Sequence, residues 1–229
     1  MVQLRNVFFY LFLLVLPYLF PVALAADEHS FAQRFQVGAN WKASKEWYLR
    51  GTTQTRYREG MSDFFMFLTD LGVEYRPAAF KRLRMPILYR FQDRENVEGW
   101  RSNHYVLIDP TLSLLRLGRW EIDCRPRLQL NIEEDFRLIY LRPLLRLNRG
   151  FRFHERAGRA WVYYDHYFTM QRRVRRASAD PSEFSTGVSL PLSPRYDLLL
   201  YYMINSSRAK SSPDWIRIHQ SCLALSFKL

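Results

Sequence analysis

The chain has 229 residues, enough for one large or two small domains, with a formal net charge of +12 and 16% aromatic residues. In a cytosolic protein this basic, aromatic composition would suggest binding to nucleic acid. The N-terminus instead carries an export pattern, and the arginines are spread through extended segments, which argues against a nucleic-acid partner. We expect anionic solutes or lipopolysaccharide phosphates as partners.

The first thirty residues have the three parts of a secretory signal. Arg5 precedes an apolar run over residues 7–22, and the sequence ALAAD follows at residues 23–27. This order predicts a signal peptide over residues 1–26, cleaved after Ala25 or Ala26. An uncleaved anchor is the alternative, because a bilayer-spanning helix needs about 20 residues. Cleavage removes one arginine and no acid, so the charge of +12 falls to +11.

After residue 27 the chain alternates apolar and polar residues in one segment after another. A period of two predicts strands, because successive side chains leave opposite faces of the pleat. The clearest example is WEIDCRPRLQLN at Trp120–Asn131, with one apolar face and one face carrying four formal charges. Twelve such strands are predicted, at approximately residues 35–41, 47–57, 65–75, 83–91, 100–108, 111–117, 120–132, 136–147, 160–171, 184–192, 196–205 and 215–229.

The strand count is open at two places, and at one of them, residues 147–158, the chain either makes an extra turn or extends a neighbouring strand. Residues 105–117 form either two strands or one strand interrupted at Asp109-Pro110, and bacterial barrels have even strand numbers, so ten is the alternative to twelve. Pro86, Pro126 and Pro143 fall inside predicted strands, where each removes a ladder hydrogen bond. We expect strand ends or bulges at these prolines.

Alternation alone fits a soluble sandwich as well as a membrane barrel. Two features favour the barrel. Aromatic residues occur at strand ends, as interface girdles require: Trp41, Trp47, Tyr57, Tyr75, Trp100, Trp120, Trp161, Tyr196 and Trp215. The polar phase is also too charged for a packed core, and it predicts a lumen charge ladder of Arg82, Arg84, Arg90, Glu121, Asp123, Arg125, Arg127, Arg142 and Arg146.

The C-terminal strand ends in LALSFKL, with Leu223, Leu225, Phe227 and Leu229 on one face. It resembles the terminal strand that the assembly machinery of Gram-negative outer membranes recognises. It departs from that signal in lacking a final aromatic residue and in having Ala224 where glycine is usual. If this strand ends in the periplasm, the segment at residues 172–183 is an outer loop.

Two further expectations concern this loop and the cysteines. Arg172, Arg173, Arg175 and Arg176 would contact lipopolysaccharide phosphates or another polyanion, or simply keep a solvated loop charged. Cys124 and Cys222 lie on opposite faces of their strands, which is incompatible with disulfide geometry, so we expect two free thiols.

Taken together, Trp41, CRPRLQL at residues 124–130 and YLRPLLRLNRGFRF at residues 140–153 resemble the family called domain of unknown function 2490. The resemblance covers nearly the whole chain after the signal and implies a small Gram-negative outer-membrane β-barrel. It implies no reaction.

Some outer-membrane barrels hydrolyse lipids, which makes each candidate nucleophile relevant. Ser102 and His104 project to one face, with Asp109 downstream, but their order is the reverse of the His-x-Ser pattern of lipid A deacylases. Asp165 and His166 lie on opposite faces, so they do not pair. No metal-ligand spacing or phosphate-binding loop occurs, and we expect neither metal nor cofactor.

The sequence therefore predicts an all-β, closed, antiparallel, up-and-down transmembrane barrel over residues 27–229. We expect a monomer in the bacterial outer membrane that contacts lipid and lipopolysaccharide and is not an enzyme. Its role is structural, or it is a narrow anion-favouring pore with an arginine-rich lumen. The alternatives are an outer-leaflet lipid-modifying hydrolase and a secreted soluble β-sandwich.

Overall fold

The computed structural model describes residues 31–58, 61–96, 98–133, 137–153, 155–170, 178–209 and 216–229. The predicted signal peptide lies outside the described residues. No helix in the described part is long and apolar enough to cross a membrane. The strands are β1 (Phe31–Lys42), β2 (Trp47–Arg58), β3 (Asp63–Tyr75), β4 (Leu83–Asn96), β5 (Gly99–Ile108), β6 (Thr111–Leu117), β7 (Trp120–Asn131), β8 (Arg137–Phe153), β9 (Arg156–His166), β10 (Phe168–Thr169), β11 (Ser178–Pro191), β12 (Tyr196–Ala209) and β13 (Ile216–Lys228).

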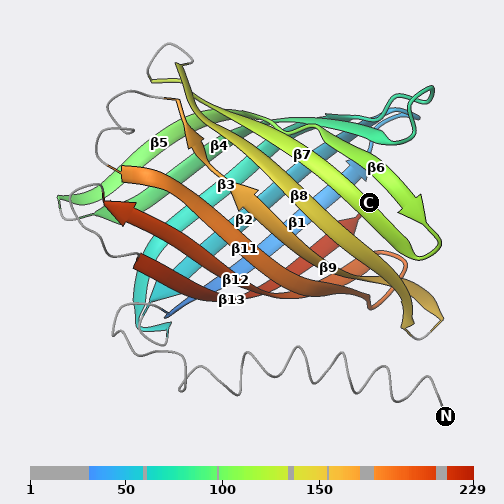
Figure 1. The fold of residues 1–229 in the computed structure, drawn as a ribbon. Helices are drawn as coiled ribbons and strands as arrows, with labels where there is room; N and C mark the ends of the chain where they lie inside the picture. Colours follow the sequence, from blue (N-terminus) through green and yellow to red (C-terminus); the bar gives the residue numbers. More distant parts are fainter. Residues whose placement is uncertain are drawn as a thin grey trace.

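These strands form one closed barrel, as the sequence predicts (Figure 1). Neighbouring wall strands are mostly consecutive along the chain, β7 pairs with β8, and β13 closes the ring on β1. A sandwich has two separate sheets, whereas the described strands belong to a single sheet. The soluble-sandwich alternative is therefore wrong for this fold.

The ring has eleven wall positions instead of the twelve predicted. β5 and β6 both lie between β4 and β7, so they are two pieces of one wall strand interrupted at Asp109-Pro110. β10 likewise continues β9 along the same edge of β8. The interrupted-strand alternative for residues 105–117 is confirmed.

The odd number of wall strands explains the closing pair. In an up-and-down barrel the first and last of an odd number of strands run in the same direction, so they pair parallel. β1 and β13 do so, from Phe31 opposite His219 to Asn40 opposite Lys228. The expectation of a wholly antiparallel barrel with an even count is corrected at this single seam, because residues 100–108 and 111–117 share one wall position.

The prolines lie beside the strand interruptions. Pro126 and Pro143 face each other in β7 and β8 and do not end their strands, contrary to our expectation. On its other side, β7 adjoins the gap between β5 and β6, and β8 adjoins the gap between β9 and β10 at Tyr167. A proline has no N–H to donate to the ladder. The interruption of the neighbouring strand at that point therefore costs no hydrogen bond from the proline.

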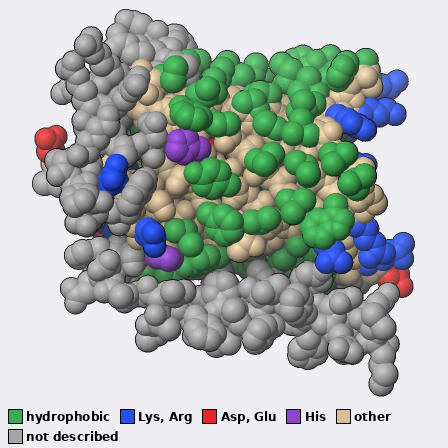
Figure 2. All heavy atoms as spheres, viewed as in Figure 1, with side chains coloured by type: hydrophobic (Ala, Val, Ile, Leu, Met, Phe, Trp, Pro, Cys, Tyr) green, Lys and Arg blue, Asp and Glu red, His purple; other side chains and the backbone are tan. Residues whose placement is uncertain are grey.

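The outer face of the barrel is apolar through its middle. Figure 2 shows hydrophobic side chains spread over the visible outer wall, with most of the visible Lys and Arg at one end and a few at the other. Large apolar side chains are exposed in the centres of many strands, such as Val37, Leu71, Ile87, Leu145 and Leu223. A water-facing surface rarely leaves so continuous an apolar band exposed.

Aromatic residues form a belt near each end of this band. Trp41, Trp47, Trp120 and Tyr196 are exposed at the end that holds the C-terminus, which we call the C-terminal end. At the other end Phe64 stacks on Trp100, with ring centroids 5.3 Å apart. Trp161 departs from the predicted girdle and lines the lumen, because it is in phase with Tyr163 and Asp165. Trp215 lies outside the described residues.

Candidate functional site

The lumen of the barrel contains a cavity of about 340 Å³ with a strongly charged wall. Its wall carries nine arginines, which come from β1, β2, β4, β7 and β8: Arg34, Arg50, Arg56, Arg84, Arg90, Arg125, Arg127, Arg142 and Arg146. They point inward because each lies in the polar phase of a strand whose alternate residues form the apolar outer face. This cavity is the candidate functional site.

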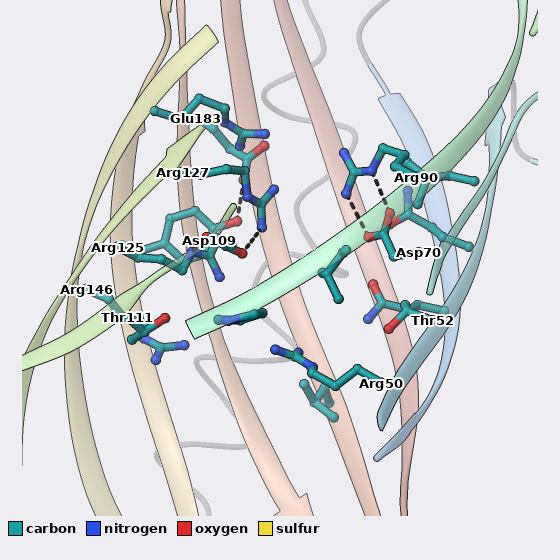
Figure 3. A pocket seen from close by; sticks show the side chains of 18 of the residues that line it. Arg50, Thr52, Asp70, Arg90, Asp109, Thr111, Arg125, Arg127, Arg146 and Glu183 are labelled. Carbon is teal, nitrogen blue, oxygen red and sulfur yellow. Dashed lines mark hydrogen bonds and ion pairs between the residues drawn. The ribbon is translucent and has the colours of Figure 1, made fainter. Parts of the chain in front are cut away.

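Asp70 and Arg90 form a two-pronged ion pair on one side of the cavity (Figure 3). Nε and Nη2 of Arg90 donate to the two carboxylate oxygens of Asp70 at 2.7 and 2.8 Å. The residues lie opposite each other in β3 and β4. Such fork geometry fixes the guanidinium plane as well as neutralising its charge.

Asp109 occupies the interruption between β5 and β6. Its backbone N–H donates to the carbonyl of Pro86, and its carboxylate, which is buried, pairs with Arg127 at 2.6 Å and Arg125 at 3.2 Å. Figure 3 shows this cluster across the cavity from Asp70. The irregular backbone thus positions one carboxylate between two arginines that project from the same face of β7.

Two further buried carboxylates hold arginines of β8. Asp123 accepts from Arg146 at 2.7 Å and from the amide of Asn148 at 2.8 Å. Asp165 of β9 pairs with Arg142, whose guanidinium also lies 3.7 Å from the ring centre of Tyr167. These contacts order the guanidinium groups on the wall.

The remaining lumen acids are Glu74 and Glu183. Glu74 pairs with Arg50 at 2.7 Å and with Arg76. Glu183 is buried and accepts hydrogen bonds from the hydroxyls of Tyr163 and Tyr167, the latter at 3.3 Å.

The cavity and its immediate partners are not electrically balanced. Nine arginines line it, against the four acids Asp70, Glu74, Asp109 and Glu183 in the lining and the two buried acids Asp123 and Asp165 behind it. The nine lining arginines exceed these six acids by three positive charges, and Arg76, which shares Glu74 with Arg50, is a further cation outside the lining. Within the described part of the chain, Arg34, Arg56 and Arg84 have no carboxylate at ion-pair distance.

Most of the predicted charge ladder does face the lumen. Six of its arginines line the cavity, and Asp123 is buried against Arg146. Glu121 lies farther toward the C-terminal end, where it accepts from Ser113 at 2.8 Å and pairs with Arg159 at 3.7 Å. Arg82 was predicted wrongly: it is exposed in the turn before β4 begins at Leu83, so it has no place on the lumen wall.

Arg34, Arg50 and Arg56 line the cavity but were not predicted. They lie in phase with Gln36, Thr52 and Gln54, so the polar phase of residues 34–56 indicates that they face the lumen. That signal is weak, because these arginines are separated by neutral residues instead of forming a dense charged run.

The predicted Ser102 and His104 do lie on one face, on the outside of β5. Ser102 donates to Asp93 at 3.2 Å, and Nδ1 of His104 shares a 2.6 Å hydrogen bond with the hydroxyl of Tyr89. Asp109, the third residue considered, lies in the lumen with its two arginines. In a Ser–His pair the histidine takes the proton of the serine hydroxyl, and here Ser102 is bonded to Asp93 while His104 is bonded to Tyr89.

The structure also bears on the cysteines, the Asp-His pair and the loop arginines. Cys124 and Cys222 are both free thiols, as predicted. Asp165 faces the lumen and His166 the outside, also as predicted. Arg172, Arg173, Arg175 and Arg176 lie outside the described residues. Among the residues that are described, no group of three or more His, Cys, Asp or Glu side chains is placed to hold a metal ion.

The fold and the cavity define a small closed β-barrel with an arginine-lined lumen. The family model described as "Protein of unknown function (DUF2490)" matches residues 34–217, so the chain belongs to that family, as its motifs indicated. The match includes most of the barrel wall and all nine lumen arginines.

The other comparisons add little. No curated protein matches the chain. A chain from the solved structures described as "Unveiling the Mechanism Behind the in-meso Crystallization of Membrane Proteins" is 10% identical, with a TM-score of 0.38, covering 82% of this chain and 81% of that one. At that TM-score the likeness carries no argument.

Proposed function

We propose that this protein is a bacterial outer-membrane barrel whose lumen is a narrow, anion-favouring pore. The observation that carries the proposal is the excess of three positive charges around the cavity. A passage with one dominant sign of charge and low-dielectric walls concentrates counter-ions of the opposite sign. Ordered ion pairs line the rest of the wall, which limits the width of the passage.

Three features support the membrane location. The outer wall is apolar between two aromatic belts, as in barrels that span a bilayer. The described strands pair in a closed ring, so the middle of the described wall offers no open sheet edge to lipid. The sequence of residues 1–26 has the pattern of an export signal. The same features suit a monomer that contacts lipid and lipopolysaccharide and is inserted by the outer-membrane assembly machinery through its last strand.

Recording from the purified barrel in planar bilayers under a potassium chloride gradient tests the pore. We expect small conductance steps whose reversal potential has the sign of chloride permeation. A reversal potential of potassium sign, or no steps in bilayers that contain folded protein, would refute the proposal. Turnover of lipid A or phospholipid that is lost in Ser102→Ala would favour the hydrolase alternative instead.

A further inference from the structure

Two of the arginines that lack carboxylate partners lie directly opposite each other. Arg34 of β1 and Arg56 of β2 are cross-strand neighbours, and both line the cavity. Like charges in this position repel and destabilise a sheet. The pair therefore needs a compensating negative charge to be a favourable part of the wall.

A second arginine pair in the same lumen shows how the barrel meets this need elsewhere. Arg127 of β7 and Arg142 of β8 are also direct cross-strand neighbours. Asp109, which also pairs with Arg125, pairs with the first and Asp165 with the second, so each of the two charges contacts a carboxylate. Arg34 and Arg56 have no such partner among the described residues.

The groups that Arg34 hydrogen-bonds are neutral. Its guanidinium donates to the Tyr201 hydroxyl at 3.4 Å, a long contact, and to the Met203 sulfur, a weak acceptor, at 3.6 Å. Its Nε has no hydrogen-bond partner, although only 8% of the residue is exposed; Nε of Arg127 and of Arg142 is also unpartnered, but each of those guanidinium groups is paired with a carboxylate. A buried guanidinium with an unused donor is costly unless an acceptor reaches it.

Arg56 is also served by a neutral group. The Gln54 side chain, with its amide oxygen turned toward Arg56, accepts from Nη2 at 2.9 Å. The carboxylate of Glu183 is close enough to attract both arginines electrostatically. Its hydrogen bonds, however, come from the hydroxyls of Tyr163 and Tyr167. The barrel's own carboxylates thus leave the pair without a direct counter-charge.

We propose that Arg34 and Arg56 form a binding site for one small oxyanion, with inorganic phosphate as its simplest representative. Two guanidinium groups on adjacent strands can donate several hydrogen bonds to the oxygens of an oxyanion. A spherical ion offers no such set of separate acceptors, so it fits the pair less well. The Tyr201 hydroxyl is an additional donor beside Arg34. The inference rests on the proposed function, because the anion reaches this site through the lumen.

Calorimetric titration of the folded barrel with inorganic phosphate, in a phosphate-free detergent and chloride buffer, tests the site. We expect saturable binding of one phosphate per barrel. Arg34→Gln and Arg56→Gln should each weaken it by at least about tenfold, since each removes hydrogen bonds to a charged group. Arg34→Lys should weaken it less than Arg34→Gln, because lysine keeps the charge but loses the fork.

Arg84→Gln is the matched control, because it removes one unpaired positive charge from elsewhere on the lumen wall. We expect phosphate binding to change by less than about twofold in this variant. Heat-modifiable gel migration verifies that each variant is folded. Absence of phosphate binding in the wild type, wild-type affinity in Arg34→Gln, or equal weakening by Arg84→Gln would each overturn the site.

The bilayer recordings separate this inference from the proposed pore. Anion-favouring conductance without phosphate binding would refute the oxyanion site alone. Saturable phosphate binding at Arg34 and Arg56 in a barrel without conductance would support the site and refute the pore.

Discussion

At the level of single residues, the lumen is ordered by carboxylates that each hold one or two arginines. Asp109 is buried and forms ion pairs with two arginines, Arg125 and Arg127. Removing one member of a buried ion pair leaves a charge that neither water nor a partner compensates. The stability of the barrel should therefore depend on this one carboxylate.

We predict that Asp109→Asn lowers the free energy of unfolding by about 3–5 kcal/mol. Urea-induced unfolding from detergent, monitored by tryptophan fluorescence, gives the value. Asp63→Asn is the control, because its partner Arg58 is 45% exposed and such pairs contribute about 0–1 kcal/mol. Equal losses in the two variants would contradict the role assigned to Asp109.

The sequence predicted which residues face the lumen better than it predicted their partners. Alternation assigns Arg125, Arg127 and Arg142 to the polar face without knowledge of neighbouring strands. The partners depend on register, which brings Asp165 of β9 to Arg142 across β8 and β9. Asp109 was considered only with Ser102 and His104, because nothing in the sequence shows that its carboxylate turns inward at the interruption.

At the level of strands, close backbone approach constrains the wall as much as side-chain pairing does. Gly72 of β3 lies so near β4 that an added Cβ would come within 2.1 Å of the Ile87 carbonyl oxygen and 2.8 Å of the Leu88 Cα. Backbone atoms cannot move aside as the tip of a flexible side chain can. The pairing of β3 with β4 therefore requires glycine at this position.

We predict that Gly72→Ala reduces the fraction of folded barrel after refolding into detergent, because β3 and β4 must separate to accept the methyl group. Gly38→Ala is the matched control, since its nearest neighbour would lie 3.4 Å away. Heat-modifiable migration on gels measures the folded fraction. A Gly72→Ala barrel that folds as completely as Gly38→Ala would show that the strands are less tightly spaced.

The positions of the strands were predictable, but their number was not. The predicted strand at residues 120–132 is β7 at Trp120–Asn131, and that at residues 196–205 is the first part of β12. The count failed because Asp109-Pro110 interrupts a strand without moving it out of the wall. Pro126 and Pro143 likewise lie within β7 and β8 without ending them. Each lacks an N–H donor where the strand on its other side is interrupted.

At the level of the whole molecule, the odd strand count places the start of β1 and the end of β13 at opposite ends of the barrel. The C-terminal end is also strongly basic. Its exposed cations include Lys42, Lys45, Lys81, Arg82, Arg116, Arg119, Arg149, Arg156 and Arg195. In the expected orientation, with the C-terminal end in the periplasm, this basic rim faces the periplasm.

We predict that a cysteine at Glu98, which is exposed at the end opposite the C-terminus, reacts with a membrane-impermeant maleimide in intact cells. A cysteine at Pro194, which is exposed in the turn after β11, should react only after the cells are opened. Both variants are made in a background with Cys124→Ser and Cys222→Ser. Labelling of Pro194→Cys but not Glu98→Cys in intact cells would reverse the orientation.

We propose that Arg34, Arg56 and Arg84, which have no carboxylate partner among the described residues, give the lumen its preference for anions. The most direct test is the reversal potential of the triple variant Arg34→Gln, Arg56→Gln, Arg84→Gln beside the wild type, under the same potassium chloride gradient. Neutralising the excess charge should move the reversal potential from the chloride sign of the wild type toward zero. A folded, conducting triple variant with the wild-type reversal potential would show that these arginines do not set the anion preference.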